Sequence, residues 1–348
     1  MLSQARSITY FGVLRSISSW AKVSRELLTE LARQGIKINI CERRGFLFEK
    51  DFRLETELAE AITNRFDGSP ILTFEHPRIY PYLPKECHCT GMLVYEFTHL
   101  PLFWVQAINR YLDLVLVPSR FCREVFVQSG VLASKVRVLR YGYNPRWYYP
   151  AQTPRIGDFR FLCVANPHKR EGIDFLLDAF CLAFEDTDAV ELVIKLTYLP
   201  KRPAKPFEMG GLEDLIRGHP RRLVRERVKL LTHRLSEEEM GNLYRQADAY
   251  VSFSRCEAFG LCFLEALACG LPVIGCAWSG PGDFLSEANA SLLKYSLVPC
   301  CGEEYEMGEE EQMLALPDIE HGADLCLLYT SDAADDLLCV DLGGRRII

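Results

Sequence analysis

Short apolar runs alternate with amphipathic segments along the first half of the chain. The apolar runs predict strands over residues 8–13, 36–41, 71–74, 92–95 and 114–117. The amphipathic segments predict helices over residues 19–33 and 120–128. Gly35 follows the first helix as a stop signal, and Ser119 is placed to cap the start of the second. Because strands that alternate with helices form parallel sheets, the pattern predicts an α/β fold.

The same alternation starts again after a turn-rich segment that ends at Pro150. The second half predicts strands over residues 159–164, 192–196, 228–231, 249–253 and 272–276, and helices over residues 173–184, 237–245 and 261–269. Ser236 and Glu239 have the spacing of a capping box at the start of the second of these helices. Residues 199–227, which are rich in Pro and Arg, predict a long surface excursion.

These patterns predict two domains, residues 1–150 and residues 151–325. A chain of 348 residues with 49% hydrophobic content exceeds what one core usually fills. Each domain is predicted to be a doubly wound sheet, and the two are expected to face each other across a cleft at the carboxyl ends of their strands. Residues 326–348 are expected to lie outside this fold. Their opening stretch, CLLYTSDAADD, resembles a translated transposon-based sequencing adaptor, and its pattern predicts neither helix nor strand.

Charge and composition narrow the class of function. The chain carries 40 basic and 47 acidic residues, for a formal net charge of -7. This balance gives no broad attraction to nucleic acid or to anionic lipid. The first residues lack the pattern of a secretory signal and no transmembrane segment is visible, so a cytoplasmic location is expected. Peripheral contact with a membrane stays open.

The 14 cysteines do not indicate disulfides or a metal centre. Several of them, such as Cys163 and Cys262, lie in apolar runs, where a free thiol acts as a small buried hydrophobe. Cys87, His88 and Cys89 have no second close pair with the spacing of zinc ligands. We therefore expect reduced thiols and no metal site.

Two carboxylates carry the strongest chemical signal. Glu265 stands in the middle of the apolar run 261–269, and Glu257 precedes it by eight residues. A buried carboxylate is costly without compensation, so Glu265 predicts a polar partner that its own helix does not supply, and a ligand is the expected one. The helix after Gly260 would direct free N–H groups and a positive dipole end at a phosphate.

A nucleoside diphosphate sugar has the layout that these groups require. Glu265 would bind the ribose hydroxyls, the helix start would bind the diphosphate, and Glu257 would bind the sugar. The residues predicted to contact the donor are Gly12, Ala258, Phe259, Gly260, Leu261 and Glu265.

Polar residues at other strand ends complete the predicted site. Lys169 and Arg170, in the loop after the first strand of the second half, supply cations where a leaving diphosphate would gather charge. His99 lies at a strand end in the first half, and the family resemblance described below implies that it hydrogen-bonds the donor sugar. The alternative interpretations are a solvated basic turn for the cations and a structural role for the histidine.

Residues 244–275 resemble the retaining GT-B glycosyltransferases of family four. The resemblance rests on the segments SRCEAFG and LEALACGLPV, which hold both glutamates of the paired-glutamate motif of that family. It implies two Rossmann-like domains and metal-independent, retaining transfer of a hexosyl group without a cofactor. The implied donor is a UDP- or GDP-sugar, and the acceptor is an unidentified glycan, lipid or small molecule.

Two positions depart from the family pattern and keep a second interpretation open. Where the family commonly has an Arg and a Lys in its second domain, this chain has Ala165 and Asn166 at one place and Glu171 at the other. The alternative is a catalytically silent GT-B protein that binds a nucleotide sugar or a protein partner. A dehydrogenase is disfavoured because neither half has Gly-x-Gly-x-x-Gly after its first strand.

Overall fold

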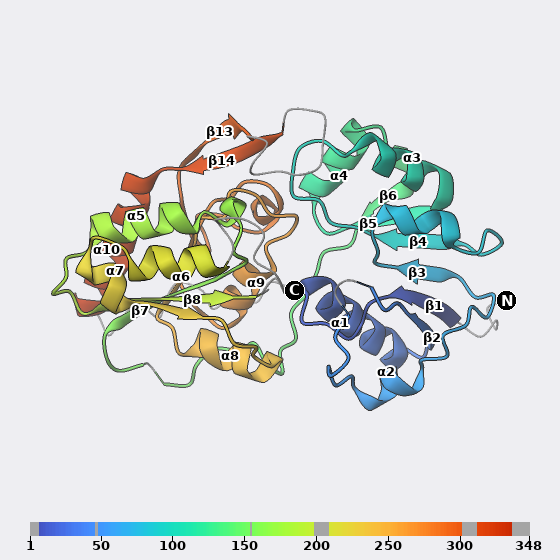
Figure 1. Cartoon of the computed structure of the whole chain (residues 1–348), viewed down its shortest axis with the longest axis horizontal. Coiled ribbons are helices and arrows are strands. Elements are labelled where there is room, and N and C mark those ends of the chain that lie inside the picture. The colour runs from blue at the N-terminus through green and yellow to red at the C-terminus, as the bar shows by residue number, and fades with distance from the viewer. Residues whose placement is uncertain (1–6, 46–47, 154, 198–208, 301–311, 336–348) are drawn as a thin grey trace. The chain divides into compact units, whose positions relative to one another are not determined.

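The computed structural model describes residues 7–45, 48–153, 155–197, 209–300 and 312–335. The chain forms two compact units that divide between Tyr141 and Gly142, slightly before the boundary at residue 150 that the sequence predicts (Figure 1). Each unit is built on a sheet of six strands, which confirms the expected α/β class.

The first unit has a wholly parallel sheet in the order β2-β1-β3-β4-β5-β6. Its strands are β1 (Ser7–Gly12), β2 (Lys37–Glu42), β3 (Ile71–Thr73), β4 (Cys89–Met92), β5 (Leu114–Val117) and β6 (Val136–Val138). Its helices are α1 (Ser19–Arg33), α2 (Thr56–Glu60), α3 (Leu102–Tyr111) and α4 (Arg120–Gln128), with short 3-10 turns η1 (Pro77–Tyr82) and η2 (Ala133–Lys135). The Ser119 hydroxyl accepts the Cys122 N–H, which confirms the predicted cap of α4.

The second unit has a parallel sheet in the order β12-β11-β10-β7-β8-β9 and a separate antiparallel hairpin. Its strands are β7 (Phe159–Ala165), β8 (Val190–Leu196), β9 (Val228–Leu231), β10 (Ala249–Ser252), β11 (Val273–Gly275), β12 (Ser291–Leu292), β13 (Tyr295–Pro299) and β14 (Met313–Pro317). Its helices are α5 (Ile173–Ala183), α6 (Met209–Arg217), α7 (Arg222–Arg227), α8 (Glu237–Arg245), α9 (Leu261–Ala268) and α10 (Ile319–Asp335), with 3-10 turns η3 (Lys169–Glu171) and η4 (Gly280–Asp283). The capping box of Ser236 and Glu239 is present at α8, as predicted.

One predicted strand of the first unit is displaced. The apolar run at residues 92–95 is buried, but β4 ends at Met92, and the pairing with β3 runs from Cys89 to Gly91. An apolar run reports burial, whereas main-chain pairing defines the strand. Gly91 fits this strand because a Cβ there would lie 2.5 Å from a methyl group of Leu112.

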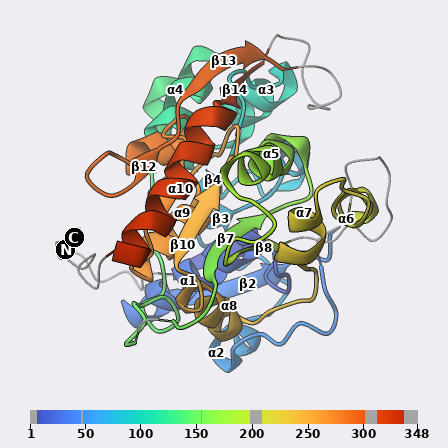
Figure 2. The same ribbon diagram turned by 90° about the vertical axis from the view of Figure 1, so that its left-hand side faces the viewer.

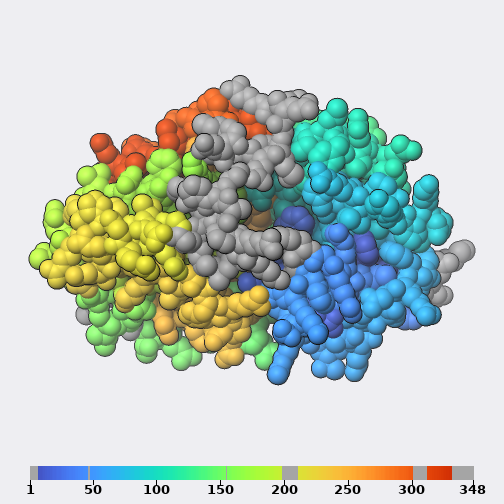
Figure 3. Space-filling model, in the orientation of Figure 1, coloured from blue at the N-terminus to red at the C-terminus, as the bar shows by residue number. Residues whose placement is uncertain are grey.

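The prediction of a surface excursion over residues 199–227 is wrong for the residues that the structure describes. Residues 209–227 contain α6 and α7, and Leu212, Ile216, Leu223 and Val224 are buried in the core of the second unit. In Figure 3 the atoms of this part of the chain (yellow) lie at the surface of that unit. The Arg-rich composition reflects their exposed faces, while their apolar residues cover one face of the sheet.

The prediction that nothing after residue 325 forms a helix or strand is also wrong. Helix α10 continues to Asp335 and lies against α5 (Figure 2). Cys326 is buried in the core, and the Tyr329 hydroxyl lies 2.8 Å from that of Ser291. Residues 336–348 lie outside the described part, and the adaptor origin of the segment stays a prediction.

The strand order of the second unit decides where a ligand can bind. In chain order its strands follow the 3-2-1-4-5-6 arrangement of Rossmann-like sheets, which reverses direction between β7 and β10. The first unit reverses between β1 and β3. The carboxyl ends of strands at such a switch point form the crevice in which α/β sheets bind ligands.

Candidate functional site

The loops after β7 and β10 meet at the switch point of the second unit. Gly172 ends the first loop with φ of 63°, and a Cβ at this position would lie 2.2 Å from the carbonyl oxygen of Phe253. The Arg255 N–H donates to the Arg170 carbonyl at 2.7 Å. A glycine at position 172 is therefore what lets the two loops approach so closely.

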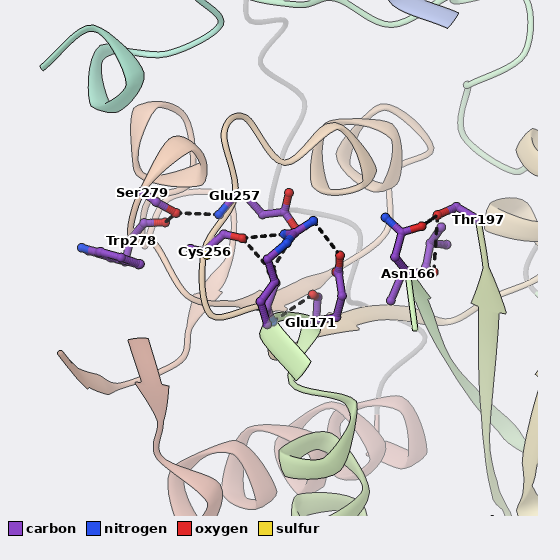
Figure 4. A network of polar contacts seen from close by, with 12 residues as sticks. Asn166, Glu171, Thr197, Cys256, Glu257, Trp278 and Ser279 are labelled. Carbon is purple, nitrogen blue, oxygen red and sulfur yellow. Dashed lines mark hydrogen bonds and ion pairs between the residues drawn. The ribbon is translucent and has the colours of Figure 1, made fainter. Parts of the chain in front are cut away.

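Arg170 and Glu257, both predicted site residues, form an ion pair at this switch point, and Figure 4 shows Glu257 beside Cys256 and Glu171. The guanidinium Nη1 of Arg170 lies 3.3 Å from Oε1 of Glu257 and donates to the Cys256 carbonyl at 2.8 Å. Its Nη2 lies 3.0 Å from Oε1 of Glu171, which is buried. The Ser254 hydroxyl donates to Glu257 Oε1 at 2.9 Å. Arg170 is thus shared between two carboxylates, and Glu257 is held in one orientation.

A third loop, at residues 279–282, fixes the main chain of Glu257. The Glu257 N–H donates to the Ser279 hydroxyl at 2.9 Å, and the Gly280 N–H donates to the Glu257 carbonyl at 2.8 Å. A Cβ at Gly280 would lie 2.3 Å from the Ala258 carbonyl oxygen, so the two loops pack main chain against main chain. The sequence analysis did not identify Ser279 as part of the site.

Helix α9 begins directly after the loop of Glu257, without a capping side chain. Its N-cap is Gly260, with φ of 88°, and its first turn has no acidic residue. A helix start of this kind favours an anion through its N–H groups and its dipole. Ala258 and Phe259 are buried and Leu261 is half-buried, so these predicted donor contacts would act through their main chain.

Glu265 is buried, as predicted, with 3% of its surface exposed, but it has a protein partner that the sequence analysis missed. The Tyr244 hydroxyl of α8 donates to Oε2 of Glu265 at 3.1 Å. Burial raises the pKa of Tyr244 well above its usual range, so the phenol stays protonated as a donor. Tyr148 packs edge-on against Tyr244 and donates to Glu237 at 2.7 Å. The carboxylate is therefore stabilised before any ligand binds.

Lys169 and Asn166 lie in the loop after β7. Lys169 begins the turn η3 and is half-buried. The Thr197 hydroxyl donates to Oδ1 of Asn166 at 2.6 Å, which links the ends of β7 and β8. Glu171 and Asn166, at the positions that depart from the family pattern, are thus both engaged within the protein.

The other two predicted site residues, Gly12 and His99, belong to the first unit. Gly12 ends β1, and a Cβ there would lie 2.5 Å from the Tyr10 hydroxyl, so close packing alone accounts for the glycine. The His99 ring nitrogen Nδ1 lies 3.3 Å from the Thr98 hydroxyl, and its carbonyl accepts a hydrogen bond from Tyr95. The predicted contact of these two residues with the donor stays a prediction.

A hollow of about 400 Å³ lies at the switch point of the first unit. It is lined by residues that follow β1, β2 and β3 and by the first turn of α1, among them Val13, Trp20, Arg43, Phe74, Glu75, His76 and Arg78. Trp20 stacks on Phe74 with ring centroids 5.0 Å apart, and Arg43 pairs with the buried Glu75. The sequence analysis did not identify this hollow.

Metal ligands and disulfides do not occur in the described ranges. No group of three or more His, Cys, Asp or Glu side chains there is placed to hold a metal ion, and every cysteine described there is a free thiol. None of the described helices has both the length and the apolar character needed to cross a membrane.

Comparison with solved structures identifies the class to which this fold belongs. The chain superposes on HepE of Anabaena, solved with UDP and glucose, with a TM-score of 0.67 at 14% identity, covering 94% of this chain and 91% of that one. It superposes equally well on sucrose-phosphate synthase of Thermosynechococcus elongatus, with a TM-score of 0.67 at 17% identity and coverage of 94% and 90%. The chain therefore has the GT-B glycosyltransferase fold.

The sequence comparisons match the chain to glycosyltransferases as well. Residues 158–296, which lie within the second unit, match the family described as "Glycosyl transferases group 1". The sulfoquinovosyl transferase SQD2 of Arabidopsis thaliana is 25% identical over 234 residues, which cover 63% of this chain and 40% of that protein. The chain spans between 35% and 40% of the length of the curated relatives it matches.

Proposed function

We propose that the chain is a retaining hexosyltransferase that uses a UDP- or GDP-sugar as its donor. The observation that carries the proposal is the position of Glu257. It stands at the switch point of a Rossmann-like sheet, held by Ser254 and Arg170, directly before the uncapped start of α9. A ligand that presents a diphosphate beside sugar hydroxyls matches this combination.

Each end of the donor has a proposed partner in the second unit. The diphosphate binds at the start of α9 beside Gly260, the transferred sugar hydrogen-bonds to Glu257, and the ribose hydroxyls bind to Glu265. Lys169 and Arg170 contribute positive charge at the same crevice. Solved proteins of this fold contain UDP or UDP-glucose, which supports the choice of ligand class.

The proposed chemistry needs electrostatic stabilisation more than acid–base catalysis. When the bond between the sugar and the diphosphate breaks, negative charge develops on the leaving phosphate. The dipole of α9 and the cations after β7 are fixed before this happens, so they stabilise the transition state without reorganisation. The acceptor attacks from the face that the diphosphate leaves, and this retention is inferred from the family resemblance.

The acceptor is proposed to bind in the hollow of the first unit. Trp20 and Phe74 provide an aromatic surface of the kind on which a sugar ring packs, and Arg43, Glu75 and His76 provide hydrogen-bonding groups. A Trp20→Ala variant should raise the KM for a productive acceptor and leave the affinity for UDP unchanged. An unchanged acceptor KM would exclude this hollow.

A second candidate function is a silent protein that binds a nucleotide sugar without turnover. Its support is the engagement of Arg170 by Glu171 and Glu257, because a cation already paired with carboxylates offers less charge to a leaving diphosphate. In this case the full chain would bind UDP or GDP tightly and release no sugar from any donor.

Incubation of the full chain with a panel of UDP- and GDP-sugars separates the two candidates. The enzyme should release free nucleotide slowly in the absence of acceptor, and Glu257→Ala should abolish this release. Glu238→Ala, which alters an exposed carboxylate in the first turn of α8, is the matched control and should keep the activity. Release that is equal in both variants would refute the role of Glu257.

A further inference from the structure

One buried lysine of the second unit has no countercharge among the residues that the structure describes. Lys195 lies one residue before the end of β8 with only 3% of its surface exposed. Its ammonium donates to the carbonyl oxygen of Leu196, and the structure gives it no ion pair with any described carboxylate. An ammonium group has three donors, so one contact with a neutral carbonyl leaves its charge uncompensated.

The same strand holds a second buried charge, and that charge is paired. The Glu191 carboxylate, four residues earlier, is also buried, and it pairs with both Arg160 and Lys229. A buried ion without a partner is strongly unfavourable, so β8 carries one charge that is matched and one that is not. Burial lowers the pKa of Lys195, as expected for an unmatched ammonium.

The position of Lys195 is at the ligand-binding edge of the sheet. Its register partners are Val164 on β7 and Leu231 on β9. Because side chains alternate along a strand, Lys195 shares a face with Val193, which packs in the same cluster as Tyr244 of the Glu265 pair. This is the face that α8 and α9 cover, and β7 is the strand whose loop carries Arg170.

Arg170 and Asn166, which lie at the same edge of the sheet, offer little unshared positive charge to a nucleoside diphosphate. A nucleoside diphosphate carries at least two negative charges. Arg170 is shared with Glu171 and Glu257, and the link between Asn166 and Thr197 beside β8 is neutral. We infer that Lys195 is a phosphate-binding residue of the donor site, and that the negative charge missing around it in the free protein is supplied by the donor diphosphate. The inference rests on the proposed function, because it assigns a residue to the same ligand.

The test compares UDP, GDP and uridine as ligands of the full chain. We measure their affinities by isothermal titration calorimetry for the wild type and for Lys195→Met, with Lys229→Met as the matched control on β9. Lys195→Met should weaken the binding of the nucleoside diphosphate at least tenfold and leave uridine affinity within twofold. Lys229→Met should change neither affinity, although it removes a partner of Glu191.

Stability of the free protein gives the second measurement. Because Lys195 is unmatched, Lys195→Met should leave the urea midpoint equal or higher, whereas Lys229→Met should lower it. The inference is overturned if Lys195→Met binds the diphosphate as the wild type does. It is also overturned if the variant unfolds at lower urea and loses diphosphate and uridine affinity in parallel, because that is the signature of a structural role. A wild type that binds neither UDP nor GDP would refute the proposed function itself.

Discussion

Ser279 has a backbone conformation that a serine rarely adopts, and this makes a sharp prediction about stability. Its φ is 61° and its ψ is −142°, and Asn64 is the other non-glycine residue with positive φ in the described ranges. Such a conformation costs on the order of 1–3 kcal/mol and persists only where surrounding contacts enforce it. Two side-chain hydrogen bonds are among these contacts: the hydroxyl accepts the Glu257 N–H at 2.9 Å and donates to the Trp278 carbonyl at 2.6 Å.

The perturbation is a pair of substitutions at this position. Ser279→Ala and Ser279→Gly both remove the two hydrogen bonds, at a cost of about 0.5–1.5 kcal/mol each. Glycine also relieves the backbone strain. The added freedom of the unfolded chain destabilises the glycine variant by only about 0.4–1 kcal/mol. Ser279→Gly should therefore be more stable than Ser279→Ala by about 1 kcal/mol, the reverse of the usual order.

The assay is urea unfolding followed by far-UV circular dichroism. Ser252, buried at the end of β10, provides the matched control. Because its backbone is extended, Ser252→Ala should be more stable than Ser252→Gly. A Ser279→Ala protein as stable as Ser279→Gly would refute the idea that strain is stored at this position. Donor affinity should fall in both variants, because both lose the acceptor that holds the Glu257 main chain.

Three further predictions concern the scaffold of the second unit, each measured by urea unfolding. Gly172→Ala should destabilise the protein by about 2–4 kcal/mol, because φ is positive and the Cβ would lie 2.2 Å from a main-chain oxygen. A cost below about 1 kcal/mol would mean that the loops after β7 and β10 can separate with little loss of stability. Burial raises the pKa of Glu191, but hydrogen bonds from Lys229 and Arg160 outweigh it and leave the pKa below its usual value. The stability from Glu191 is therefore present at neutral pH and lost as the pH falls below about 4.5, so the wild type should lose more stability on acidification than Glu191→Gln. Val224→Ala in α7 should cost about 2 kcal/mol, whereas a residue of a surface excursion would cost under about 0.5 kcal/mol.

The sequence was sufficient for the elements whose signals are local. The start of α8 follows from Ser236 and Glu239, which bond to each other across a single turn, and α4 follows from its cap in the same way. Helix α6 was missed although Leu212 and Ile216 stand four residues apart, as on one helix face, because the Pro and Arg residues around them outweighed that signal. The helical spacing of the apolar residues in this segment, and not its composition, corresponds to its structure.

Some residues of the candidate site also have local signals in the sequence, and others do not. Glu257, Gly260 and Glu265 lie within one loop and the helix that follows, so their relation could be predicted from spacing alone. Tyr244 reaches Glu265 from another helix, and Lys195 owes its significance to a burial that one sequence does not reveal. Ser279 had a local signal, because the segment SGPG indicates a turn, but no local signal connects that turn to Glu257.

The order of the strands in the sheet determines which loops meet, and the motifs alone do not show this. The loop of Arg170 and the loop of Glu257 are far apart in the chain, and each follows a strand end, as several other loops do. They meet because β7 and β10 are neighbours at the point where the sheet reverses its order, and because Gly172 lets the second loop approach the first. The loop after β8 comes next in the sheet, which brings Lys195 to the same edge. Strand order thus brings together residues that lie in separate motifs. For this reason, the residues at the ends of neighbouring strands are the most informative about mechanism, whatever their separation in sequence.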